Sequence, residues 1–109
     1  MELAFLNKEL RELCEDEDIA IVQLGVVIAK ELQSRLADLA AATSVNDLLT
    51  GRPKAIENQA WPSYKIDLAN GFRLVFCANH VKAPVNQNGT IDWSRVNHIK
   101  ILQIEETNE

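Results

Sequence analysis

The sequence predicts a single α+β domain over residues 1–109, in which an N-terminal helical hairpin packs on an antiparallel sheet of three to four strands. Three observations support this prediction. Apolar residues recur at helical spacing in the first 42 residues, and an Asn-Gly pair separates two strand-like runs near residue 70. The last apolar stretch, residues 97–105, is rich in isoleucine, which favours a strand near the centre of the sheet.

The N-terminal part predicts a short strand followed by helices. Residues 2–6 favour the strand, and Asn7 is a suitable N-cap for the helix that follows. The acidic run of residues 15–18 is either a solvated face of one long helix or a break between two, and we favour one helix. Gly25 ends this helix, and a second one extends to Ala42. The two apolar stripes are Leu6, Leu10, Leu13, Ile21 and Leu24, then Ile28, Leu32, Leu36 and Leu39.

A β-hairpin with an Asn-Gly turn is predicted for residues 64–77, because both turn residues tolerate positive φ. Successive side chains of a strand point to opposite faces. One face of the hairpin is therefore charged, with Lys65, Asp67 and Arg73 on it. We expect this face to stay open while the other meets the core. The apolar face consists of Ile66, Leu68, Phe72, Leu74 and Phe76.

Two further segments are predicted to be loops. Residues 51–62 contain glycine and prolines and carry the cations Arg52 and Lys54. Residues 79–96 contain a proline and a second Asn-Gly pair, so we expect a long excursion before the last strand. Long loops in compact domains are often functional.

Charge is unevenly distributed along the chain. The net charge is −5, which argues against nonspecific binding to nucleic acid. Residues 1–50 hold ten acids and four bases, residues 51–100 hold three acids and seven bases, and residues 101–109 add three acids. The middle segment alone therefore favours an anionic partner.

The composition indicates an ordinary cytoplasmic protein. No apolar run reaches the roughly 18–20 residues that cross a bilayer, and the first residues lack the basic-then-apolar pattern of a signal segment, so we expect none. The two cysteines, Cys14 and Cys77, are too few for a disulfide framework and lack the spacing of metal ligands. We expect reduced thiols, no metal and no cofactor.

One strand carries a resemblance to a known family. The run Phe72-Arg73-Leu74-Val75-Phe76 resembles the Tyr-Arg-Leu-Ile-Phe strand of the RelE/ParE toxin superfamily, in its HigB-like branch of plasmid maintenance system killer proteins. Residues 29–42 are similar to that branch's second helix, and residues 88–105 to its closing segment. The resemblance extends over nearly the whole chain.

The resemblance implies a RelE-like fold with a twisted sheet and the function of a toxin in a type II toxin–antitoxin system. The partner would be a cognate helix-turn-helix antitoxin, in a dimer or a toxin–antitoxin heterotetramer. The best-known activity of the superfamily is metal-independent cleavage of mRNA on the ribosome, whereas the ParE branch poisons DNA gyrase.

Metal-free RNA cleavage needs a base for the 2′-hydroxyl, a cation on the phosphate and an acid for the leaving 5′-oxygen. Arg73 matches the family's strand arginine and suits the phosphate, unless it forms a salt bridge with Asp67. Lys65 is either catalytic or an ordinary surface lysine, and His98 is a candidate for proton transfer. The residues expected to bind RNA are Arg52, Lys54, Tyr64 and Lys100, of which Tyr64 would either stack on a base or pack.

The C-terminal end differs from the family pattern. Family members commonly end in Glu-Asp-Tyr-His, whereas this chain has Thr107 and Asn108 at the last two positions, and neither side chain transfers protons near neutral pH. Three hypotheses stay open. The chain is a nuclease toxin, a binding protein of the same fold such as a gyrase poison or degenerate toxin, or a regulatory partner of a small DNA-binding protein.

Overall fold

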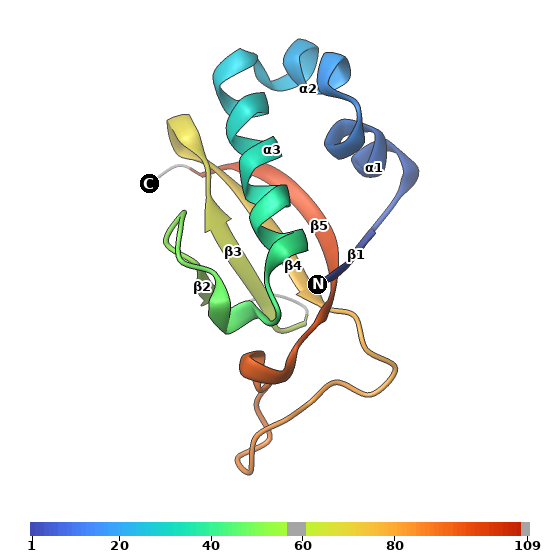
Figure 1. The fold of residues 1–109 in the computed structure, drawn as a ribbon, viewed down its shortest axis with the longest axis vertical. Helices are drawn as coiled ribbons and strands as arrows, with labels where there is room; N and C mark the ends of the chain where they lie inside the picture. Colours follow the sequence, from blue (N-terminus) through green and yellow to red (C-terminus); the bar gives the residue numbers. More distant parts are fainter. Residues whose placement is uncertain (57–60, 108–109) are drawn as a thin grey trace.

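The computed structural model describes residues 1–56 and 61–107. In this part of the chain three α-helices pack with a five-stranded mixed sheet, and α3 crosses one face of that sheet (Figure 1). The strand order is β1-β5-β4-β3-β2. The elements are β1 (Glu2–Phe5), α1 (Lys8–Glu15), α2 (Glu17–Leu24), α3 (Val26–Ala41), β2 (Lys54–Ile56), β3 (Ser63–Asp67), β4 (Phe72–Ala78) and β5 (His98–Glu106).

The α+β class is confirmed, but the sheet differs from the predicted antiparallel one of three to four strands. The short strand β1 pairs parallel to β5, which makes the sheet mixed. The segment 51–62, predicted to be a loop, contributes the edge strand β2, which pairs antiparallel to β3. Only three residues of this segment enter the sheet, too few to show alternation in the sequence.

The helical region contains three helices instead of the predicted two. Asp16 ends α1 and caps α2, because its Oδ1 accepts hydrogen bonds from the backbone N–H groups of Asp18 at 3.0 Å and Ile19 at 3.2 Å. The acidic run is therefore a break, and the prediction of one helix was wrong. The N-cap prediction is confirmed, since Asn7 Oδ1 accepts from Leu10 N at 2.8 Å.

The core lies between α3 and one face of the hairpin formed by β3 and β4. Ile66, Leu74 and Phe76 are buried there together with Leu32 and Leu39 of α3. The prediction that the apolar face of the hairpin meets the core is thus confirmed, whereas the face of Lys65, Asp67 and Arg73 is only partly open, because Val75 and Cys77 on it are buried. The hairpin turn has the expected positive φ at Asn70 (57°) and Gly71 (79°), but the loop holds three residues, Ala69–Gly71, because the backbone N–H of Leu68 donates to the carbonyl oxygen of Phe72.

A β-bulge in β5 adjusts the pairing of the two longest strands. Phe76 pairs with Ile101 and Val75 with Gln103, so Leu102 is an extra residue without a partner on β4. Beyond the bulge, Glu105 stands opposite Arg73.

Gly51 connects the loop before β2 to the end of β3. Its carbonyl accepts a hydrogen bond from the backbone N–H of Asp67 at 2.6 Å, and its φ is 87°. A Cβ at this position would overlap the Ile66 side chain and lie 2.9 Å from the Asp67 carbonyl oxygen. Glycine is therefore required here both for its positive φ and for the close approach of the two segments.

Replacing Gly51 with alanine should destabilise the protein by about 2–4 kcal/mol, because left-handed strain and overpacking add. Urea unfolding would measure the loss. The matched control is Gly89→Ala, whose φ of 85° is equally strained but whose Cβ would meet open space. The control should cost about 1 kcal/mol. Equal losses in the two variants would show that the close approach at residue 51 is unimportant.

Candidate functional site

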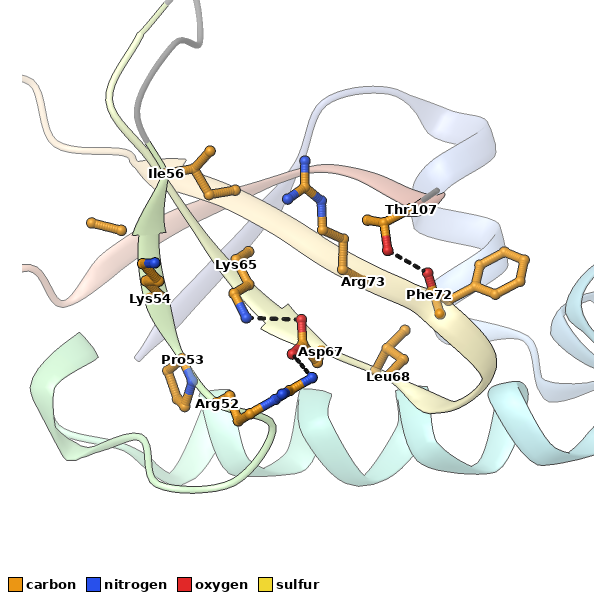
Figure 2. Close-up of a pocket in the computed structure, with 12 residues that line it drawn as sticks. Arg52, Pro53, Lys54, Ile56, Lys65, Asp67, Leu68, Phe72, Arg73 and Thr107 are labelled. Carbon is orange, nitrogen blue, oxygen red and sulfur yellow. Dashed lines mark hydrogen bonds and ion pairs between the residues drawn. The ribbon is translucent and has the colours of Figure 1, made fainter. Parts of the chain in front are cut away.

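A groove of about 910 Å³ lies over β2, β3 and β4 and holds its cations on the face of the sheet away from the core (Figure 2). At the turn of the hairpin it also reaches Leu68 and Phe72 of the opposite face. Its lining includes four cations, and these come from the loop before β2 and from three neighbouring strands. The lining residues are Arg52, Pro53, Lys54, Ala55, Ile56, Lys65, Asp67, Leu68, Gly71, Phe72, Arg73 and Thr107. With four bases and one acid, the described lining has a net charge of +3.

Asp67 lies between two of these cations (Figure 2). Its Oδ1 accepts from Lys65 Nζ at 2.8 Å, and its Oδ2 is 2.7 Å from Arg52 Nη2. Partial burial acts to raise the pKa of this carboxyl, but the Lys65 hydrogen bond and the charges of Lys65 and Arg52 outweigh it and hold the pKa below its usual range. The carboxylate is therefore ionised near neutral pH and is a poor proton acceptor.

Arg73 emerges from β4 on the groove side, and its guanidinium is turned away from Asp67 (Figure 2). The alternative of a salt bridge between these two residues is wrong, because the partner of Arg73 is Glu105 on β5. Both Nε and Nη2 of Arg73 lie 2.8 Å from the same oxygen, Glu105 Oε1. A guanidinium has five N–H donors, and within the described residues Glu105 engages its Nε and Nη2, which leaves Nη1 to reach a ligand.

Two local features of the groove are unfavourable in the absence of a ligand. Lys54 and Lys65 are directly opposite each other in the β2–β3 pairing, where like charges repel. Arg52 has a φ of 49°, a left-handed conformation that costs a residue with a Cβ about 1–2 kcal/mol. Backbone strain of this kind clusters at functional sites, which makes the groove a candidate binding site.

Of the seven predicted site residues, Arg52, Lys54, Lys65 and Arg73 come together in the groove, and the other three do not. Tyr64 belongs to the opposite face, where its ring centroid lies 4.9 Å from that of Trp93 and 5.7 Å from that of Phe76. Of the two alternatives for Tyr64, the structure therefore favours packing.

His98 and Lys100 lie at the far end of β5 from the groove. His98 is seven residues from Glu105, the partner of Arg73, which corresponds to roughly 20 Å along the strand. Its ring instead contacts that of His80, with centroids 5.1 Å apart. Lys100 faces the same side as Arg73, but it pairs with Cys77, about 13 Å along β4 from Arg73. Neither residue lines the groove.

Two contributors to the site, Glu105 and Thr107, were not among the predicted site residues. Glu105 follows an extra residue in its strand, so alternation alone could not place it beside Arg73. Thr107 lines the groove, and its Oγ1 donates a hydrogen bond to the Gly71 carbonyl oxygen at 2.9 Å. Its signal was its position just after the last strand. Asn108 lies outside the described residues.

Other reactive groups of the described chain do not suggest chemistry elsewhere. Burial raises the pKa of the Cys14 thiol to about 12, which makes it a poor nucleophile. Within residues 1–56 and 61–107, no three His, Cys, Asp or Glu side chains cluster in a way that would hold a metal ion. No helix of the same residues is long and apolar enough to cross a membrane.

Comparison with known proteins gives no identification, because no family model, curated protein or solved structure matches the chain.

Replacing Lys54 with glutamate should stabilise the protein by about 0.5–1 kcal/mol, because an attractive pair with Lys65 would replace a repulsive one. Chemical denaturation at low salt would measure the gain. The control is Lys82→Glu, which makes the same change of charge at an exposed loop position. A gain no larger than that of the control would show that the two lysines do not repel each other measurably.

The contribution of Asp67 to stability should depend on pH. Because its pKa is lowered by folding, the stabilising effect is present above the unfolded pKa of about 3.9 and is lost as pH falls through the folded value. The free energy of unfolding of the wild type should therefore exceed that of Asp67→Asn near neutral pH, and the difference should vanish on acidification. A difference that is independent of pH would contradict a stabilised carboxylate.

Proposed function

We propose that this chain is a HigB-like toxin of the RelE/ParE superfamily, acting in a type II toxin–antitoxin system as a ribosome-dependent mRNA endoribonuclease. RNA would lie in the groove with a phosphate on Arg73, and the 2′-hydroxyl would attack that phosphate without a metal ion. The expected partner is a cognate helix-turn-helix antitoxin, and the expected location is the cytoplasm.

The observation that supports this function most is the gathering of Arg52, Lys54, Lys65 and Arg73 in one groove on the sheet face away from the core. The chain as a whole is acidic, so a local excess of cations is a specific feature of this face. Phosphates are the anions that such an array recognises best, and arginine can bind them through two N–H groups.

The position of Thr107 gives further support for a shared site. By resemblance, Thr107 stands where the family has its terminal tyrosine, and Arg73 stands where the family has its strand arginine. The two positions come from segments separated in sequence, yet both line the same groove. This convergence is expected if the groove corresponds to the family's active site.

The groove contributes charge to the reaction more clearly than proton transfer. Arg73 can offset the negative charge that grows on the phosphate in the transition state. The described lining contains no histidine, tyrosine or cysteine, and Asp67 is a weak base. Among the described lining residues, Lys54 and Lys65 are the remaining candidates for moving protons, so cleavage would rely on Arg73 for charge and on these lysines for proton transfer.

A second function, binding without cleavage, is favoured by the same lining. With threonine in place of the tyrosine, a degenerate toxin would still hold a nucleic acid or dock on gyrase by charge. Translation in a cell-free system with purified protein separates the two functions. Cut message supports the nuclease, and intact message together with an arrested ribosome or inhibited gyrase supports the binder.

A third hypothesis is a regulatory partner of a small DNA-binding protein. This protein would not harm cells on its own. Induced expression that leaves growth unaffected, with normal translation and gyrase activity, would favour it over both toxin functions.

Arg73→Ala should relieve the growth arrest caused by induced expression and reduce mRNA cleavage by about 10²–10³-fold, because one strong transition-state donor is lost. Primer extension on cellular mRNA would measure cleavage. The control is Arg11→Ala, which removes the same charge from an exposed pair with Glu15 on α1. Undiminished arrest in the Arg73 variant, at equal protein level, would remove Arg73 from the mechanism.

A further inference from the structure

The cations of the groove already hold carboxylates in the absence of a ligand. Asp67 uses its two oxygens separately, one for Lys65 and one for Arg52. Glu105 uses a single oxygen for two nitrogens of Arg73. Three of the four cations are therefore engaged with an internal anion in the same way that they would engage phosphate oxygens.

The three cations that contact a carboxylate differ in how far their side chains are exposed to solvent. The side chains of Lys65 and Arg73 are 15% and 23% exposed, whereas that of Arg52 is 87% exposed. Exposed ion pairs contribute little to stability and exchange partners readily. Arg52 can therefore leave Asp67 for a ligand while Lys65 stays. Arg73 binds Glu105 through Nε and Nη2. Glu105 must give up at least one of these nitrogens before a phosphate can bind both nitrogens of that edge of the guanidinium.

We propose that Asp67 and Glu105 compete with RNA phosphate for the cations of the groove, Asp67 for Arg52 and Glu105 for Arg73. Binding then exchanges an internal carboxylate for an external phosphate, and the two acids set how tightly RNA is held. This inference rests on the proposed function and adds a regulation of the same site. It implies that removing either negative charge makes the protein a stronger binder.

The test measures binding of a short fluorescein-labelled 2′-O-methyl oligouridylate, which cannot be cleaved, by fluorescence anisotropy over a range of salt concentrations. Asp67→Asn and Glu105→Gln keep a hydrogen-bonding oxygen and remove the charge. Each should tighten binding by about two- to five-fold, because a cation no longer has to leave an internal carboxylate. The dependence of log K on log salt should stay the same, because the same cations reach phosphate in the wild-type complex. Glu15→Gln, the same charge change on α1, should alter neither quantity.

A double-mutant cycle tests which cation Asp67 restrains. In an Arg52→Ala background, Asp67→Asn should give a smaller gain than in the wild type, because Arg52 is no longer there to be released. An equal gain in both backgrounds would overturn the assignment of Asp67 to Arg52.

The binding results distinguish failure of the proposed competition from failure of the proposed RNA-binding function. One outcome is that the wild type binds and Arg73→Ala weakens binding, but neither Asp67→Asn nor Glu105→Gln binds more tightly than the Glu15→Gln control. This outcome overturns the competition between carboxylate and phosphate and supports the RNA groove. Absence of binding in the wild type and in both acid variants overturns the RNA groove itself. If one variant fails to fold, as judged by circular dichroism, the other decides the outcome alone.

Discussion

The alternation of side chains along β4 is the constraint on which both the core and the groove depend. Leu74 and Phe76 are buried beneath α3, so the side chains of Arg73 and Val75 must point to the opposite face of the sheet. A slip of one residue would bury the guanidinium and expose the leucine and phenylalanine. The free energy gained by burying the apolar face therefore also fixes the direction of the charged one.

The sequence was sufficient where a pattern was local and long enough to repeat. The hairpin, its turn and the direction of Arg73 followed from alternation and Asn-Gly chemistry. Alternation could not reveal the parallel pairing of β1 with β5, because parallel partners lie far apart in the chain. The helical periodicity could not decide whether Asp16 continued the first helix or capped the next one, because an acidic residue suits both positions.

The site was predictable in its cations but not in their partners. Arg52, Lys54, Lys65 and Arg73 are readable as a basic set in sequence, and the sheet brings them to one groove. Their engagement by Asp67 and Glu105 depends on cross-strand register and on a left-handed residue, which no short-range pattern encodes. The distance of His98 from the groove was also not predictable, because alternation assigns a residue to a face of the sheet and says nothing of its distance along the strand.

The unpaired Leu102 has a consequence for how this sheet tolerates insertion and deletion. It reverses the parity of β5, so that Ile101 and Ile104, an odd number of positions apart, both point to the core. If β5 paired regularly with Leu102 inside the ladder and no bulge, Ile104 would stand opposite Arg73 and Glu105 opposite Phe72. Deletion of Leu102 itself would therefore leave Glu105 opposite Arg73, because it removes the residue of β5 that β4 does not pair. The bulge is what keeps a carboxylate, and not an isoleucine, beside the guanidinium while Leu102 is present.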